Sequence, residues 1–163
     1  MKEYIVELLA DFPESVATVL IAMIPITELR ASIPIAITQF EMHPIVAMGY
    51  SILGNVVAGA IVLFFVEHVL HLFLAQSETL ERLWQKYVNR IHKSNKEKFE
   101  RWGSIMLVAF VAIPLPMTGI FTGAVAASIF QIPFRQAFPL LAIGSVISGI
   151  IVTLITVGAT SLI

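Results

Sequence analysis

Two charged residues lie where charge is costly, inside a long apolar segment of this 163-residue chain. Glu28 and Arg30 are the only charged residues between positions 15 and 40. A charge at the bilayer centre costs about 2.5–3.5 kcal/mol on insertion scales, so a functional role is the default hypothesis for it. A carboxyl group can bind and release a proton, and a guanidinium can bind a phosphate or carboxylate through two hydrogen bonds. The pair therefore predicts a site for a proton and an anionic group.

The spacing of these residues adds two local expectations. Glu28 and Arg30 are two positions apart and do not share a helix face, so they need not neutralise each other. Thr27 is expected to cap the helix that begins after it, with Glu28 in the first turn. The alternative is a structural ion pair with a distant partner such as Arg135 or Glu67.

A second apolar segment, 104–130, is interrupted in the same way but carries no charge. Proline breaks the helical hydrogen-bond ladder, and lipid cannot replace the lost bonds. The residues after the prolines offer a hydroxyl and a close backbone approach, although they also suit tight packing. The candidate substrate and proton site therefore comprises Pro25, Thr27, Glu28, Arg30, Pro114, Pro116, Thr118 and Gly119. Asn55, for which helix packing is the favoured reading, and Arg135 are secondary candidates.

Composition decides the class of protein. The chain is 58% hydrophobic and 13% charged, whereas soluble domains average about 45–50% and 25%. The uncharged runs 42–66, 104–134 and 136–163 each exceed the ~20 residues that cross a hydrocarbon core. A soluble globular domain is excluded, and the sequence predicts an all-α integral membrane protein. The chain has no cysteine, no basic groove for nucleic acid, no metal-ligand pattern and no catalytic constellation, so no enzyme activity or cofactor is predicted.

The apolar segments fall into two similar halves. Ile24-Pro25 recurs as Ile113-Pro114 and Pro44 as Pro133, at an offset of 89; Gly54 and Gly59 recur as Gly144 and Gly149, at an offset of 90. Such self-similarity indicates duplicated units. We predict that each unit is a re-entrant helical hairpin followed by one transmembrane helix. One crossing per unit inverts the second unit and brings both hairpins to the midplane, where transporters bind substrate. The alternative is a bundle of four spanning helices.

The domain organisation follows from these segments. A single membrane domain is expected to comprise an N-terminal amphipathic helix (1–13), repeat 1 (14–71), a basic segment (76–102) and repeat 2 (104–163). The basic segment holds seven Lys or Arg and four Glu, which predicts a cytoplasmic position in a multi-pass plasma-membrane protein. Its apolar stripe predicts an amphipathic helix in the headgroup layer, or else a helical hairpin without lipid contact.

Two motifs resemble a known family. The run from Pro25 to Pro34 (PITELRASIP) and the run from Ile113 to Gly119 (IPLPMTG) resemble the small multidrug export protein family, which looks like a distant relative of the DedA (VTT) membrane protein superfamily. The resemblance implies two facing re-entrant hairpins and proton-coupled movement of polyprenyl-phosphate or phospholipid headgroups. It also implies that Glu28 stands at the acid of the first hairpin. The arginines that flank the second proline in DedA relatives are absent here, and Ala112 stands beside Pro114.

These observations predict a transport protein without enzyme activity. The favoured function is proton-coupled translocation or export of an amphipathic substrate of the lipid-phosphate headgroup class, through a midplane site between the hairpins. One alternative is an exporter of hydrophobic cations, in which Glu28 alone binds the substrate. The other is a non-transporting membrane assembly or organising protein. Expected partners are membrane lipids, the substrate, protons and a second copy of the chain in a homodimer.

Overall fold

A computed structural model describes residues 12–75, 103–115, 118–130 and 132–161. Within these ranges the chain forms six helices and no strand, which confirms the predicted all-α fold. The predicted basic segment 76–102 and residues 1–11 of the predicted N-terminal helix lie outside the described residues. The helices are α2 (Glu14–Ala22), α3 (Glu28–Thr38), α4 (Pro44–Ala75), a helix that spans Gly103–Ala112, α6 (Ile120–Ile129) and α7 (Phe134–Thr160).

The helices of the described ranges fall into two length classes. The apolar stretch Pro44–Val66 of α4 has 23 residues and α7 has 27, and both are long and apolar enough to cross a membrane. The other four helices have 9 to 11 residues. At a rise of 1.5 Å per residue they are only about 14–17 Å long, roughly half the thickness of a hydrocarbon core.

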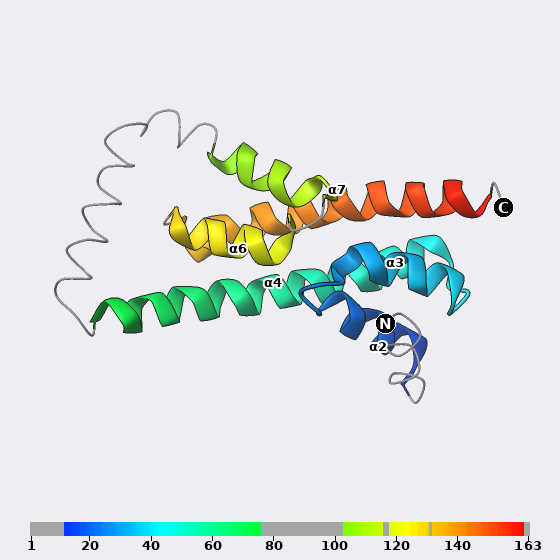
Figure 1. The fold of residues 1–163 in the computed structure, drawn as a ribbon, viewed down its shortest axis with the longest axis horizontal. Helices are drawn as coiled ribbons and strands as arrows, with labels where there is room; N and C mark the ends of the chain where they lie inside the picture. The colour runs from blue at the N-terminus through cyan, green and yellow to red at the C-terminus, as the bar shows by residue number, and fades with distance from the viewer. Residues whose placement is uncertain (1–11, 76–102, 116–117, 131, 162–163) are drawn as a thin grey trace.

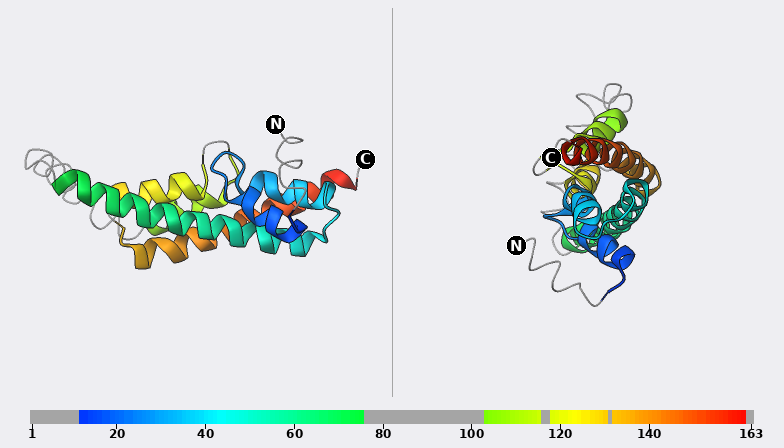
Figure 2. Two further views of the ribbon diagram at one scale, coloured as in Figure 1. Left: turned by 90° about the horizontal axis from the view of Figure 1, so that it is seen from below. Right: turned by 90° about the vertical axis from the view of Figure 1, so that its right-hand side faces the viewer.

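The short helices form two pairs at opposite ends of the long helices (Figure 1). α2 and α3 pack against each other and against the N-terminal half of α4. The helix Gly103–Ala112 and α6 lie at the other end, beside the N-terminal half of α7. α4 and α7 run antiparallel (Figures 1 and 2). The two interruptions, residues 23–27 (the first break) and residues 113–119 (the second break), meet near the middle of the long helices.

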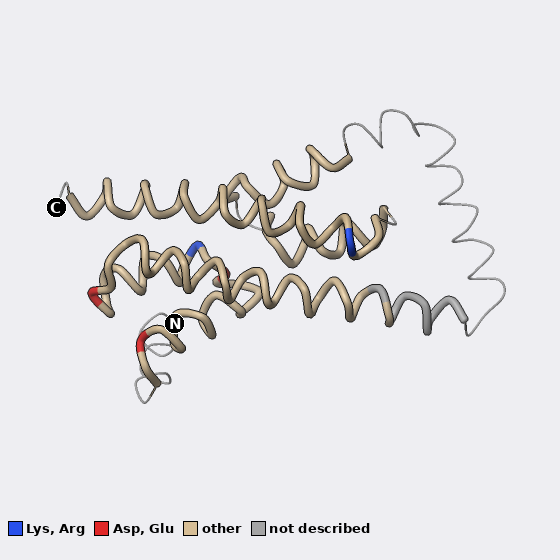
Figure 3. Tube along the Cα trace, turned by 180° about the vertical axis from the view of Figure 1, so that it is seen from behind, with Lys and Arg blue, Asp and Glu red and all other residues tan. Residues whose placement is uncertain are grey.

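The distribution of side chains is that of a membrane protein. The described ranges contain only six charged residues, and charged positions are sparse along the trace in Figure 3. Large apolar side chains on α4 and α7 are more than half exposed, among them Phe64, Phe65 and Leu154. Small and polar residues fill the contact between the helices instead, which is the arrangement expected where lipid is the solvent. The buried polar residues of this contact are Ser51, Asn55, Ser145 and Ser148.

Corresponding glycines make the same contact in each half. A Cβ atom on Gly54 of α4 would overlap the backbone oxygen of Val19 in α2. A Cβ atom on Gly144 of α7 would lie 3.1 Å from the backbone oxygen of Val108 in the helix Gly103–Ala112. The two valines are 89 residues apart and the two glycines 90 residues apart. The offsets found in the sequence therefore recur as equivalent helix contacts.

Gly54→Ala is expected to lower the thermal unfolding midpoint of the detergent-solubilised protein. Its Cβ atom would push α2 away from α4, and such overpacking costs about 1–3 kcal/mol. Gly49→Ala on the same helix is the matched control, because a Cβ atom there would meet nothing within 4 Å. Alanine favours a helix over glycine by up to about 1 kcal/mol, so the control is expected to keep or raise the midpoint. A Gly54→Ala midpoint at or above that of Gly49→Ala would contradict the close contact.

Candidate functional site

The first break is shaped by Pro25 and Thr27. Pro25 lacks a backbone N–H and cannot continue the helical ladder from α2. The Thr27 hydroxyl donates to the carbonyl oxygen of Ile21 at 2.7 Å and lies 3.3 Å from that of Ile24, in the turn that follows α2. The prediction that Thr27 caps α3 is wrong, because its side chain makes no capping bond to that helix. The hydroxyl points back to the Ile21 carbonyl oxygen, whose i+4 partner in a continued helix would be Pro25, which has no backbone N–H.

The second break also contains a threonine whose hydroxyl lies close to backbone carbonyl oxygens. The Thr118 hydroxyl lies 3.0 Å from the carbonyl oxygen of Ile113 and 2.9 Å from that of Leu115. Pro114 lies in this break, as Pro25 does in the first, while the predicted site residue Pro116 lies outside the described residues. Both interruptions are thus stabilised by a threonine that satisfies carbonyl groups near the end of the preceding helix.

Glu28 reaches across to the second half of the protein. It is buried, with 7% of its surface exposed, and its carboxylate accepts hydrogen bonds from the backbone N–H groups of Phe121 and Ile120. These groups lie in the first turn of α6, where the helix dipole favours a negative charge. Gly119 makes the approach possible, since a Cβ atom there would overlap both carboxylate oxygens. Glu28 therefore acts as a cap for α6, which has no side-chain cap at its own N-cap residue.

The backbone of Glu28 is unusual as well. Its φ of 48° lies in the left-handed region, which residues other than glycine seldom adopt and which costs of order 1–3 kcal/mol. This conformation sits at the first residue of α3, between the break and the helix. Strained residues persist only where the surrounding structure holds them, and they are concentrated at functional sites.

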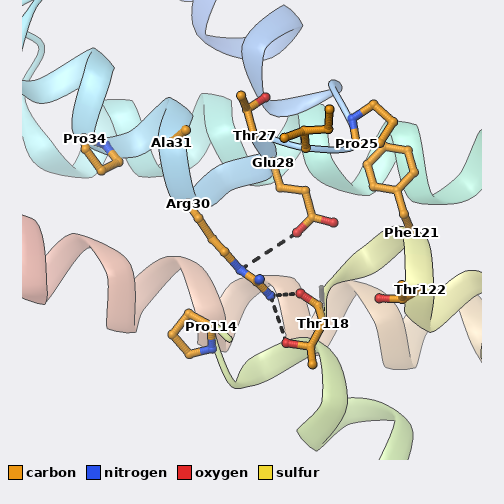
Figure 4. A pocket seen from close by; sticks show the side chains of 11 residues that line it. Pro25, Thr27, Glu28, Arg30, Ala31, Pro34, Pro114, Thr118, Phe121 and Thr122 are labelled. Atoms are coloured by element: carbon orange, nitrogen blue, oxygen red, sulfur yellow. Dashed lines mark hydrogen bonds and ion pairs between the residues drawn. The ribbon is translucent and has the colours of Figure 1, made fainter. Parts of the chain in front are cut away.

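Arg30 bonds to the other end of the second break. Its guanidinium donates to the backbone oxygens of Leu115 and Thr118, and its Nη2 lies 3.3 Å from the Thr118 hydroxyl (Figure 4). Its Nε is 3.9 Å from the nearer carboxylate oxygen of Glu28, which is too long for a hydrogen bond. Glu28 and Arg30 are thus only loosely paired with each other, and the side chain of Glu67, one partner in the alternative interpretation, lies outside the described residues. The charge of Glu28 is balanced mainly by backbone N–H groups of α6, and that of Arg30 by backbone oxygens of the second break.

A cavity of about 680 Å³ opens beside these contacts. Residues from both breaks line it, and Figure 4 shows Glu28 and Arg30 between the two. The lining is mostly apolar, and Ile26 at its edge is 87% exposed. The lining residues are Pro25, Ile26, Thr27, Glu28, Arg30, Ala31, Pro34, Pro114, Thr118, Phe121 and Thr122. An apolar cavity with a few convergent polar groups is the usual form of a small-molecule site.

The comparison with known families assigns most of the chain to one family. Residues 28–151, about three quarters of the chain, match the family model described as "Putative small multi-drug export protein". The chain belongs to this family. The match begins at Glu28 and takes in both long apolar helices apart from the end of α7. No curated protein and no solved structure matches the chain.

The family is described by export and not by an enzyme activity. It carries no statement about the substrate, and the relation to the DedA superfamily remains a prediction. The described residues contain no group of three or more His, Asp or Glu side chains that could hold a metal ion. The charged groups that line the cavity are the Glu28 carboxylate and the Arg30 guanidinium.

The structure places the remaining candidates as follows. The residues Pro25, Thr27, Glu28, Arg30, Pro114 and Thr118 line one cavity, and Gly119 packs against the Glu28 carboxylate. Asn55 lies instead between α4 and α7, and the exposed Arg135 lies in the first turn of α7, away from the cavity lining. Sequence reasoning missed Phe121 and the Leu115 carbonyl. Phe121 could have been found from its position, two residues after Gly119 at the start of a helix.

Proposed function

We propose that this protein is a proton-coupled transporter that moves an amphipathic substrate through the cavity between the two breaks. One observation carries the proposal: the two charged side chains at the start of α3 bond to the backbone of the second break and of the first turn of α6, beside that cavity. Charges buried in a membrane domain mark substrate and proton pathways. Here they also join the two halves that must separate if access is to alternate.

The proposed architecture is a pair of inverted repeats. In each repeat, a re-entrant hairpin of two short helices is followed by one spanning helix. The half-thickness helices, their position at opposite ends of α4 and α7, and the equivalent Gly54 and Gly144 contacts support this arrangement. Residues 76–102 would then face the cytoplasm, by their excess of Lys and Arg, with both chain ends on the other side of the plasma membrane.

Proton coupling would act through the cap on α6. An ionised Glu28 accepts hydrogen bonds from the first turn of that helix and is favoured by its dipole. A protonated Glu28 loses most of this attraction, because hydrogen bonds to a neutral acceptor are roughly half as strong. Protonation therefore favours separation of the two breaks, and separation favours protonation.

The substrate would act on the same contact through Arg30. The guanidinium of Arg30 donates to carbonyl oxygens of the second break. An anionic headgroup would compete with these oxygens for the same donors, because hydrogen bonds between two charged groups are stronger. Arg30 is more open to the cavity than Glu28, with side chains 20% and 9% exposed. The apolar lining and the exposed Ile26 would take the apolar part of the substrate. A lipid-phosphate headgroup fits this chemistry.

Hydrophobic cations are the second candidate substrate. The family description names multidrug export, and Glu28 lines the cavity together with Phe121. A carboxylate and an aromatic face both attract an organic cation.

Flux into proteoliposomes tests the proposal. The purified protein is reconstituted, a pH gradient is imposed, and uptake of a short-chain lipid phosphate is compared with that of a lipophilic quaternary ammonium. We expect gradient-dependent uptake of the lipid phosphate, and uptake of the cation alone would replace the first substrate class with the second. No protein-dependent flux of either class would contradict transport and leave the membrane-organising role. Cross-linking in the same vesicles tests the expected homodimer.

A further inference from the structure

A second group of polar side chains is buried where α3, α4 and α7 meet. The Asn55 side chain donates to the Ser145 hydroxyl at 3.1 Å, so these two residues mark a level at which α4 and α7 touch. Ser51 lies one turn before Asn55 in α4, and Ser148 lies one turn after Ser145 in α7. Because the two helices are antiparallel, Ser51 and Ser148 also lie at the same height along the helix pair. We call the following five side chains the polar cluster: Ser32, Ser51, Asn55, Ser145 and Ser148.

Ser32 joins this cluster from α3. α3 ends at Thr38 and α4 begins at Pro44, and the two helices pack as an antiparallel pair. Ser32 and Ser51 are each about two turns from that connection, so they lie at the same level. Glu28 is one turn from Ser32 along α3, on the same helix face. The polar cluster therefore begins one helical turn along α3 from Glu28.

Three polar atoms of the cluster have no hydrogen-bond partner in the protein. They are the hydroxyls of Ser32 and Ser51, both 0% exposed, and Oδ1 of Asn55, which is 1% exposed. Other buried hydroxyls of the described helices donate to the carbonyl four residues earlier, as Thr18, Ser128 and Thr156 do. A buried polar group without a partner costs about 1–3 kcal/mol in general, and native proteins seldom leave several together.

We propose that the polar cluster is a second site, which binds internal water molecules and passes protons from them to Glu28. Water suits the unpaired atoms, since it donates to the Asn55 oxygen and both donates to and accepts from hydroxyls. In the relay each water or serine oxygen accepts one proton and gives up another, so that the cluster is left unchanged and a proton delivered at its far end reaches the carboxylate. The amide of Asn55 positions the water and takes no proton.

The surroundings favour a neutral ligand. The charged groups near the cluster in the described ranges are Glu28, whose carboxylate is bonded to α6, and Arg30, whose donors are bonded to the second break. A bare cation would therefore lack a free carboxylate ligand. An apolar cluster formed by Leu29 and Ile33 of α3 and Val152 of α7 adjoins the polar cluster. The bound water would be internal, and protons would reach Glu28 through it from inside the protein.

The water site is tested without any substitution by water-edited solid-state NMR of the full chain in lipid. We expect magnetisation to pass from water to the Asn55 side-chain amide several times faster than to Ala47, which is fully buried one turn from Ser51. Equal, slow transfer to both positions would overturn the proposal. A rise in thermal midpoint with Na⁺ but not with choline, lost in Asn55→Ala, would also overturn it, since the cluster would then be a cation site.

Ser51→Ala tests the same site through stability and proton flux. If the cluster is dry, the change removes an unpaired hydroxyl and the midpoint stays or rises. If the cluster holds water, the change removes a partner, and we expect a fall of about 2–4 °C. Ser128→Ala is the control, because that hydroxyl bonds within its own helix, and it is expected to leave the midpoint unchanged.

The relay rests on the proposed transport function, whereas the water site does not. We expect Ser51→Ala to slow gradient-driven proton uptake severalfold in vesicles where Ser128→Ala leaves it unchanged. Rapid water transfer to Asn55 without any proton-coupled flux would refute the transport function and keep the water site. Proton-coupled flux with a dry Asn55 would refute the water site and keep the transport function.

Discussion

Arg30→Ala is expected to release the second break from the first and to cause a large loss of stability. The guanidinium donates to two backbone oxygens, of Leu115 and Thr118. Hydrogen bonds to charged groups contribute about 1.5–3 kcal/mol each, so we expect a loss of about 3 kcal/mol and a midpoint lower by several degrees. Uptake of an anionic amphiphile is expected to fall at least tenfold, and uptake of a cation much less. Thermal unfolding and vesicle flux measure the two effects.

Two further variants make this result specific. Arg135→Ala removes an equal charge from an exposed position in the first turn of α7, and it is expected to leave stability and flux near the wild-type values. Arg30→Lys keeps the charge, but a single ammonium cannot reproduce the planar guanidinium fork. We expect it to recover part of the lost stability. An Arg30→Ala protein as stable as Arg135→Ala would contradict the contact between the two breaks.

Glu28→Gln is expected to abolish the dependence of transport on a pH gradient. Glutamine keeps the shape of the side chain and one acceptor oxygen, but it cannot take up or release a proton. Its amide group also brings donors toward the N–H groups of Phe121 and Ile120, which weakens the cap on α6. We expect gradient-driven uptake to fall at least tenfold, and exchange of substrate across the membrane without a gradient to persist. Uptake and exchange assays on one preparation separate these outcomes.

The control for this variant is Glu14→Gln. Glu14 is exposed in the first turn of α2 and lies outside the cavity lining, so its substitution is expected to leave gradient-driven uptake unchanged. Wild-type dependence on the pH gradient in Glu28→Gln would show that another group carries the proton.

The contact between the breaks explains why the two halves differ in charge. Met117 and Gly119 stand in the second half where Glu28 and Arg30 stand in the first, at the offset of 89. The first half supplies an anion for the start of α6 and a cation for the carbonyls before it. The second half needs a glycine instead, because a Cβ atom at position 119 would overlap the Glu28 carboxylate.

Much of the fold follows from local sequence. The prolines locate both interruptions, and the uncharged runs locate α4 and α7, because helix breaking and lipid solvation depend on short stretches of chain. The 90-residue offset also relates Asn55 to Ser145, which the structure joins by a hydrogen bond. Glu28 and Arg30 were singled out because a charge in the hydrocarbon core costs free energy, and they line one cavity with Pro114 and Thr118.

The partners of those residues could not be predicted in the same way. Local spacing suggested that Thr27 caps α3 and that Glu28 faces its own helix. In the structure, Thr27 bonds back to α2, and Glu28 bonds to α6 some 90 residues away. Which free backbone groups meet a side chain depends on how the two halves pack, and that information is spread over the small residues of the long helices.

Side-specific labelling tests most directly the central claim, that the breaks meet from opposite sides of the membrane. The chain has no cysteine, so single cysteines at Ser161, just after α7, and at Ser94, in the basic segment, can be introduced and labelled from either face with an impermeant thiol reagent. Two spanning helices and two re-entrant hairpins place these positions on opposite faces, and we expect each to react from one face only, with Ser94→Cys reacting on the cytoplasmic face. Labelling of both positions from the same face would mean that the short-helix segments span the membrane, and would contradict the account.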